Sequence, residues 1–143
     1  MHILITGGAG FIGSNLTRKL FQNDPSVRIT CIDNFDPFYK EEIKRFNIRD
    51  FMALPGYQFI QADISTCTAE EMTGLIKGSV DVIVHIAAKA GVRPSIENPL
   101  AYQQANVIGL QQMLDFARLN KIKQFVFASS SSVYGVNDHY PWK

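Results

Sequence analysis

The sequence is short of cysteine, of charge bias and of long apolar runs. Its two cysteines, Cys31 and Cys67, have no CxxC or Cys/His spacing, which argues against a zinc or other metal site and against a disulfide framework. A formal net charge of +1 without a basic run gives no sign of an electrostatic nucleic-acid surface. No apolar run approaches the roughly 18 residues of a membrane span. Met1 leads directly into an expected core strand, which leaves no room for a signal peptide.

These absences predict an ordinary globular domain. The chain has 143 residues, of which 46% are apolar and 19% are charged, and this suits one domain with a sizeable core. Isolated cysteines and the lack of a leader favour a cytoplasmic protein with no nucleic-acid or membrane partner.

A glycine-rich turn organises the amino-terminal part of the chain. The apolar run at residues 3–5 ends at Thr6, and an amphipathic helix pattern begins at Phe11. The glycines between and just beyond them are Gly7, Gly8, Gly10 and Gly13. Glycines allow a sharp turn off a strand and a close approach of a ligand to the backbone. The following helix begins with free N–H groups and its positive dipole end, which suits a pyrophosphate.

Three features around this turn match the dinucleotide-binding fingerprint. A strand precedes it, a helix follows it, and Asp33 closes the next apolar run about twenty residues after Gly13. A plainer interpretation treats Gly8, Gly10 and Gly13 as ordinary turn glycines. A P-loop shares the GxxxxG spacing, but Ser14 stands where its phosphate-binding lysine belongs. We therefore predict a dinucleotide site rather than a nucleoside triphosphate site.

Asp33 selects between the two nicotinamide cofactors in this interpretation. A carboxylate at the end of the second strand can accept hydrogen bonds from both ribose hydroxyls of an adenosine. It would repel a 2′-phosphate, and no arginine immediately follows it to offset the charge. NAD is therefore favoured over NADP. The alternative is that Asp33 simply forms a turn at the end of the strand.

The apolar runs alternate with helical patterns along the chain. Strands are expected at residues 3–5, 27–32, 57–61, 80–86 and 124–128, and helices at 11–22, 40–51, 68–78 and 99–119. Right-handed crossovers between such units predict an α/β fold, a Rossmann-type doubly wound parallel sheet with five strands in the order 3-2-1-4-5.

Local signals mark several helix ends. Thr68 and Glu71 have the spacing of a capping box, and Gly78 is expected to close their helix. Asn98 before Pro99 predicts a helix start, and Asn120 a left-handed stop.

Further candidate cofactor residues follow the third and fourth strands. Asp63 follows the third strand at the edge shared with Asp33 and is predicted either to accept from an adenine amino group or to cap a helix. The small residues 87–91 follow the fourth strand and leave room for a ribose and a nicotinamide. Asn106 and Gly109 are poor helix-interior residues, which predicts that Asn106 orients a polar group and that Gly109 permits close packing.

The motifs together resemble the extended short-chain dehydrogenase/reductase family, and within it the NAD-dependent epimerases and dehydratases that act on nucleotide sugars. The shared segments are TGGAGFIGSNL (6–16), DNFDPFY (33–39), AD (62–63), HIAAKAGVRPSIENP (85–99), NVIG (106–109) and SSSSVYG (129–135). Two of them, DNFDPFY and AGVRPSIENP, are most similar to UDP-glucuronate 4-epimerases. Dehydratases carry an acidic pair where this chain has Ser131 and Ser132, which favours epimerisation.

The resemblance implies a reaction in which NAD takes a hydride from sugar C4 and returns it to the other face of a 4-keto sugar. Ser130 would be the catalytic hydroxyl residue. The family's YxxxK pair is expected beyond this chain, as are the last strands and the substrate domain, so residues 1–143 would be an incomplete NAD-binding domain without epimerase activity. Tyr140 and Lys143 are three residues apart rather than four, with Pro141 between them, and Tyr134 belongs to the VYG pattern.

The candidate site residues divide between cofactor and substrate. Those expected to bind NAD are Gly7, Gly10, Phe11, Ile12, Gly13, Asp33, Asn34, Asp63, Ile64, Ala87, Ala88, Lys89 and Asn106. Lys89 stands where related sequences usually have glutamine, and either holds the diphosphate or is a solvated side chain. Arg93, Ser130 and Ser131 are the candidates for binding a UDP-sugar, and a surface ion pair is the alternative for Arg93.

Other functions remain open at this stage. The chain could be a noncatalytic nucleotide-binding or interaction module, a folded remnant with an empty site, or part of a nucleotide-sugar dehydratase or reductase. Loss of the strands beyond the fifth would expose a sheet edge and an apolar helix face, so we expect a homodimer or other self-association that involves residues 100–119.

Overall fold

The computed structural model describes residues 1–137 and 139–141. Its sheet has five strands, all parallel, in the order β3-β2-β1-β4-β5. The strands are β1 (His2–Thr6), β2 (Arg28–Asp33), β3 (Tyr57–Gln61), β4 (Val82–His85) and β5 (Gln124–Phe127). The predicted Rossmann-type α/β fold and its strand order are confirmed.

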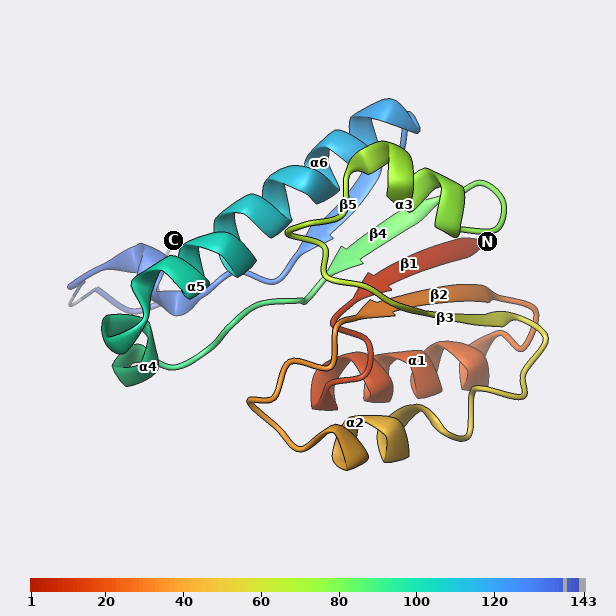
Figure 1. Ribbon diagram of the computed structural model, residues 1–143, viewed down its shortest axis with the longest axis horizontal. Coiled ribbons are helices and arrows are strands. Elements are labelled where there is room, and N and C mark those ends of the chain that lie inside the picture. The colour runs from red at the N-terminus through yellow and green to blue at the C-terminus, as the bar shows by residue number, and fades with distance from the viewer. Residues whose placement is uncertain (138, 142–143) are drawn as a thin grey trace.

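Helices cover both faces of this sheet (Figure 1). On one face lie α1 (Phe11–Asn23) and α2 (Glu41–Ile48), and on the other lie α3 (Ala69–Leu75) and α6 (Gly109–Leu119). No helix of the described residues is long and apolar enough to cross a membrane. The carboxyl ends of the strands share one edge of the sheet, and the loops that follow them extend from that edge.

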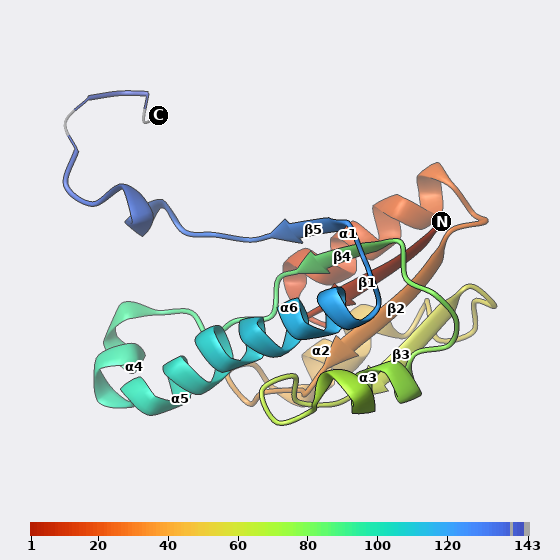
Figure 2. The same cartoon turned by 90° about the horizontal axis from the view of Figure 1, so that it is seen from above.

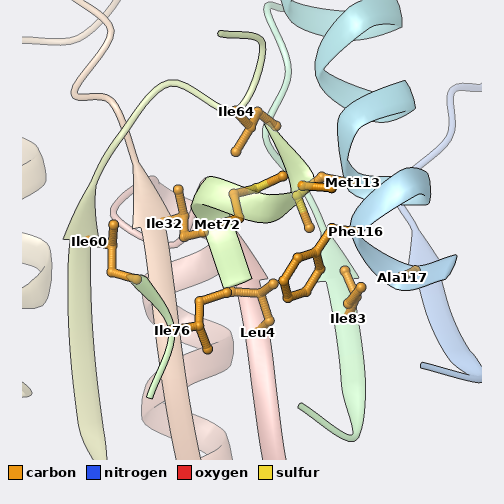
Figure 3. Close-up of a cluster of buried hydrophobic side chains, with 11 residues drawn as sticks. Leu4, Ile32, Ile60, Ile64, Met72, Ile76, Ile83, Met113, Phe116 and Ala117 are labelled. Carbon is orange, nitrogen blue, oxygen red and sulfur yellow. The ribbon is translucent and has the colours of Figure 1, made fainter. Parts of the chain in front are cut away.

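The core is divided by the sheet because β1 is buried on both faces. Leu4 points to the side of α3 and α6, where Figure 3 shows it beneath Phe116 and close to Met72. Ile3 and Ile5 belong to the cluster on the opposite face. Side chains of α1 that pack against that second cluster are Leu16, Leu20 and Phe21.

The helix expected at residues 99–119 is interrupted in its middle. It consists of α5 (Pro99–Gln103), a π-helical segment (Gln104–Ile108) and α6. Asn98 caps its start, with its Oδ1 accepting from the Ala101 N–H at 3.3 Å. A Cβ on Gly109 would lie 3.2 Å from Ile64 Cγ1, so the expected close packing at this glycine is confirmed.

Three local expectations were incomplete or wrong. The short helix α4 (Val92–Glu97) was not predicted, because Gly91 before it and Pro94 within it are typical of loops and obscure a helical pattern. Asn120 is not left-handed, since its φ is −92°, and Lys121 takes that conformation with φ 57°. The Thr68–Glu71 capping box is confirmed, but α3 ends at Leu75, well before Gly78.

The chain beyond β5 runs away from the body of the domain (Figure 2). Its described residues include a 3₁₀ turn at Ser131–Tyr134. β5 is one of the two edge strands, and its Val126 and Phe127 are 54% and 50% exposed. Much apolar surface is therefore uncovered on this side of the sheet.

Candidate functional site

The glycine turn holds the amino end of α1 tightly against the ends of two strands. Gly7 has φ 70° and donates its N–H to the Ile32 carbonyl at 2.8 Å. A Cβ on Gly7 would lie 2.9 Å from the Ala87 backbone, and one on Gly13 would lie 2.6 Å from the Gly7 oxygen. Both contacts are shorter than any side chain tolerates, so glycine is required at these two positions.

No side chain of the described residues accepts a hydrogen bond from the N–H groups in the first turn of α1. Gly10 is the N-cap residue and offers no side-chain hydrogen bond, and the first turn contains no acidic residue. The N–H groups and the positive end of the helix dipole are therefore available to an anion above the turn.

A cavity of about 520 Å³ opens at the carboxyl ends of the strands above this turn. Its volume lies within the range of small-molecule sites. Every predicted cofactor residue except Asn106 lines it, namely Gly7, Gly10, Phe11, Ile12, Gly13, Asp33, Asn34, Asp63, Ile64, Ala87, Ala88 and Lys89. The structure thus brings together segments more than 80 residues apart in the sequence.

Asp33 is 6% exposed and already has three hydrogen-bond donors. Its Oδ2 accepts from the Ala9 N–H at 3.1 Å, and its Oδ1 accepts from the Phe35 N–H at 2.9 Å. Oδ1 also accepts from Lys44 Nζ at 3.1 Å. Because a carboxylate has about four acceptor positions, about one remains for a ligand hydroxyl. Asp33 thus forms the turn and lines the cavity at once.

Lys44 was missed by the sequence analysis, although it lines the cavity and pairs with Asp33. It lies on α2 and is only 8% exposed. No arginine immediately follows Asp33 in the sequence, but a lysine eleven residues later pairs with it in the fold. No local signal pointed to Lys44, since it belongs to a charged helix pattern that reads as a solvated face.

Asp63 holds a turn rather than the start of a helix. Its Oδ1 accepts from the Ser65 N–H at 2.8 Å, and its Oδ2 accepts from Asn34 Nδ2 at 2.9 Å. The N-cap of the following helix is Thr68. Partial burial raises the pKa of the Asp63 carboxyl, but hydrogen bonds from Ser65 and Asn34 outweigh this effect. The pKa is therefore below its usual value, and the carboxyl is ionised at neutral pH.

Asn106 acts through Lys89 and not by lining the cavity. Its Oδ1 accepts from the Lys89 N–H at 2.7 Å, and its Nδ2 donates to the Lys89 carbonyl at 2.9 Å. Asn106 lies within the π-helical segment, a feature that often marks functional sites. The expectation that it orients a polar group is confirmed, and the oriented group is backbone.

The side chain of Lys89 crosses to the opposite loop of the cavity. Its Nζ lies 2.6 Å from Asp36 Oδ2, with the two side chains 31% and 25% exposed. Partial burial raises the pKa of the Asp36 carboxyl, but hydrogen bonds from Lys89 and the Phe38 N–H lower it below its usual value. Lys89 is therefore not the freely solvated side chain that was one of its two interpretations.

A buried network ties the end of β1 to the end of β4. Thr6 Oγ1 accepts from the N–H groups of Ile86 and Ala87 at 3.2 Å each, and lies 2.8 Å from His85 Nδ1. His85 is 2% exposed, and burial lowers its pKa to about 4. Since the Thr6 hydroxyl proton is free to donate, neutral His85 accepts it at Nδ1. The two cavity walls are thereby joined.

The expected substrate residues lie outside this cavity. Ser130 and Ser131 are exposed after β5, and Ser130 Oγ accepts from the Ser132 N–H at 3.2 Å. Arg93 is exposed on α4, and no described residue forms a salt bridge with it. Of the dismissed Tyr140–Lys143 pair, Lys143 lies outside the described residues. Within residues 1–137 and 139–141, no three His, Cys, Asp or Glu side chains gather as a metal site would require.

Other cavity residues besides Lys44 had not been chosen as site residues, among them Asp36, Gln104, Phe38 and Tyr39. Gln104 donates its Nε2 to the Ser65 carbonyl at 3.0 Å, and so joins the π-helical segment to the loop after β3. Phe38 and Tyr39 lie at the cavity with their rings edge to face, and are 57% and 55% exposed. The aromatic run at residues 35–39 was the available signal for the last two.

Comparison with known proteins identifies the relatives of this chain. It is 38% identical to an uncharacterized protein of Methanocaldococcus jannaschii over 99% of its length, and 34% identical to a probable UDP-glucuronate 4-epimerase of Rhizobium meliloti over 99%. It spans only 43% and 41%, respectively, of the length of these two relatives.

Solved structures give the same picture. The UDP-glucuronic acid 4-epimerase of Bacillus cereus, in complex with UDP-glucuronic acid and NAD, matches with a TM-score of 0.85 and 33% identity over 97% of this chain and 43% of its own. The dTDP-glucose 4,6-dehydratase DesIV of Streptomyces venezuelae, with NAD bound, matches with a TM-score of 0.83 and 32% identity over 99% of this chain and 43% of its own. Residues 3–142 match the family model described as the NAD dependent epimerase/dehydratase family. The chain therefore belongs to the NAD-dependent epimerase/dehydratase family.

Proposed function

We propose that this chain is the NAD-binding part of a nucleotide-sugar 4-epimerase of the UDP-glucuronate type. The observation that carries the proposal is one cavity that combines the uncapped amino end of α1 with the buried Asp33–Lys44 pair. The likeness to the Bacillus cereus enzyme supports the choice of substrate class.

The residues present fit a dinucleotide diphosphate. A Cβ at Gly7 or Gly13 would overlap backbone atoms, so the glycine turn has no side chain at these two positions. The amino end of α1 offers N–H donors and a favourable dipole without a competing carboxylate. Phe11 and Ile12, which are 78% and 64% exposed, would be covered by a ligand lying there.

The Asp33 side of the cavity fits the adenosine. The free acceptor position of Asp33 suits one ribose hydroxyl, and Lys44 has two N–H donors beyond the one given to Asp33. We propose that Lys44 donates a hydrogen bond to the same ribose whose hydroxyl donates to Asp33. Asp63 and Ile64 line the same side and would contact the adenine.

The fourth-strand side would hold the nicotinamide half against Ala87 and Ala88. NAD, when bound, would supply the hydride acceptor and donor for sugar C4. Ser130 would position the sugar hydroxyl, while the proton would be removed by the family's tyrosine. No tyrosine of this sequence is followed by lysine four residues later, so we propose that the 143-residue chain binds the cofactor without epimerase activity.

A nucleotide-sugar dehydratase is the second candidate, because DesIV matches the fold almost as closely. Ser131 and Ser132 favour the epimerase, since related dehydratases have an acidic pair at these two positions. A dehydratase would need another source of acid and base at the sugar.

The remaining proposals concern compartment and assembly. Both cysteines, Cys31 and Cys67, are free, which supports the reducing cytoplasm. We propose that two copies associate through the helical stretch that begins at Leu100, where Leu100, Val107 and Leu114 are 74%, 57% and 44% exposed.

Isothermal titration of the 143-residue chain with NAD, and with NADP as control, tests the cofactor proposal. We expect the wild-type chain to bind NAD and Asp33→Ala to bind it at least tenfold more weakly. In that variant Lys44 would lack its ion-pair partner, and the ribose hydroxyl would lack its acceptor. Arg118→Gln on α6 is the control variant, since its exposed pair with Asp115 lies outside the cavity residues. Equal affinity for NAD and NADP, or no effect of Asp33→Ala, would contradict the assignment of this cavity.

A further inference from the structure

The ion pair between Lys89 and Asp36 joins two loops that leave the sheet on opposite sides of the glycine turn. Asp36 follows β2 and Lys89 follows β4, and these strands flank β1 on its two sides. The two residues are 53 positions apart in the sequence, and both line the cavity. Their contact therefore spans the cavity near the place where β1 ends.

Both ends of this bridge are fixed by other hydrogen bonds. The Lys89 backbone is held at its N–H and its carbonyl by Asn106. The loop of Asp36 is held by its own turns, in which the Asp36 N–H donates to Asn34 Oδ1 at 2.9 Å and the Phe38 N–H donates to Asp36 Oδ1 at 3.0 Å. The ion pair therefore joins two loops that other hydrogen bonds already hold in place.

A dinucleotide in this cavity would lie alongside the bridge. It would extend from the Asp33 side, past the amino end of α1, to the Ala87 side, and these are the same two sides of the cavity that the ion pair between Asp36 and Lys89 joins. We infer that the Lys89–Asp36 pair is a clasp that closes over the cofactor cleft and limits the rates at which the cofactor is taken up and released. This inference rests on the proposed NAD site.

Two roles of Lys89 would have opposite consequences for Asp36. If Lys89 served the diphosphate directly, Asp36 would compete for it, and removing the Asp36 charge would tighten binding. If the pair is a clasp, removing either partner should speed cofactor release to the same extent. A clasp also depends on the pair and not on which loop carries which charge, so exchanging the two charges should restore it.

The test is stopped-flow release of NADH, in which excess NAD displaces bound NADH from the 143-residue chain. We expect Lys89→Gln and Asp36→Asn each to accelerate release about fivefold, which corresponds to about 1 kcal/mol for a partly exposed ion pair. The exchanged double variant, Asp36→Lys with Lys89→Asp, should return to within about twofold of the wild-type rate. Arg118→Gln, which removes an exposed pair on α6, should leave the rate unchanged.

The other outcomes would overturn either the clasp or the NAD site on which it rests. Slower release from Asp36→Asn would show that Lys89 binds the diphosphate directly and that no clasp exists. Fast release from the exchanged variant, or unchanged release from both single variants, would also refute the clasp while leaving the NAD site in place. Failure of the wild-type chain to bind NADH would refute the proposed function, and the clasp with it.

Discussion

Acidification should weaken this fold through His85 before its carboxylates are protonated. His85 is 2% exposed, its ring stacks on Phe127 at 5.8 Å, and its Nδ1 accepts from the Thr6 hydroxyl. A proton on Nδ1 would remove that acceptor and place a charge between aromatic rings. The folded protein therefore resists protonation of His85, whereas the unfolded chain does not.

The size of the effect follows from the two pKa values. The pKa of His85 is about 4 in the fold and 6.5 in the unfolded chain. Because the folded value is the lower one, the stability is fully present above pH 6.5 and is lost as the pH falls toward 4. Between pH 7.5 and pH 5 the free energy of unfolding should fall by about 2 kcal/mol from this residue alone.

Urea unfolding followed by circular dichroism at both pH values measures this loss. His85→Asn is the matched variant, since its amide oxygen can accept from Thr6 and its side chain does not titrate. Burial also lowers the pKa of His2, but that contribution is common to both proteins and cancels in the comparison. A pH 7.5 to pH 5 loss as large in His85→Asn as in the wild type would refute the reasoning.

Two further predictions concern the helical stretch after residue 98. Asn106→Leu should lower the free energy of unfolding by about 1–3 kcal/mol and speed amide exchange at Lys89, because both backbone groups of Lys89 lose their partner. Asn106→Asp should fall between the wild type and Asn106→Leu. Unchanged exchange at Lys89 in Asn106→Leu would contradict the assigned contact. The double variant Leu100→Lys with Val107→Lys should shift the chain toward monomer in sedimentation velocity at micromolar concentration, while the exposed polar control Gln103→Lys should not. A wild-type chain that is already monomeric there would disprove the proposed association.

Local chemistry in the sequence was enough to predict the fold. Apolar runs separated by helical patterns predicted a parallel sheet, and right-handed crossovers left one strand order, which the structure has. The capping box at Thr68 and the cap at Asn98 were also predicted, because each is completed within three residues. The π-helical segment was not, since Asn106 and Gly109 signalled an anomaly without showing its form.

Many of the cavity residues could likewise be predicted from the sequence, because every strand of a parallel sheet ends at the same edge, although Lys44, Gln104, Phe38 and Tyr39 were missed. The partners of those residues could not. Lys44 on Asp33, Asn106 on the Lys89 backbone and Lys89 on Asp36 are separated by 11, 17 and 53 residues. Periodicity reports which face of an element is buried, but the paths of two loops decide which charged side chains meet across a cleft. The sequence by itself therefore determined which strand ends line the cavity, and only the tertiary structure decided which charges surround it.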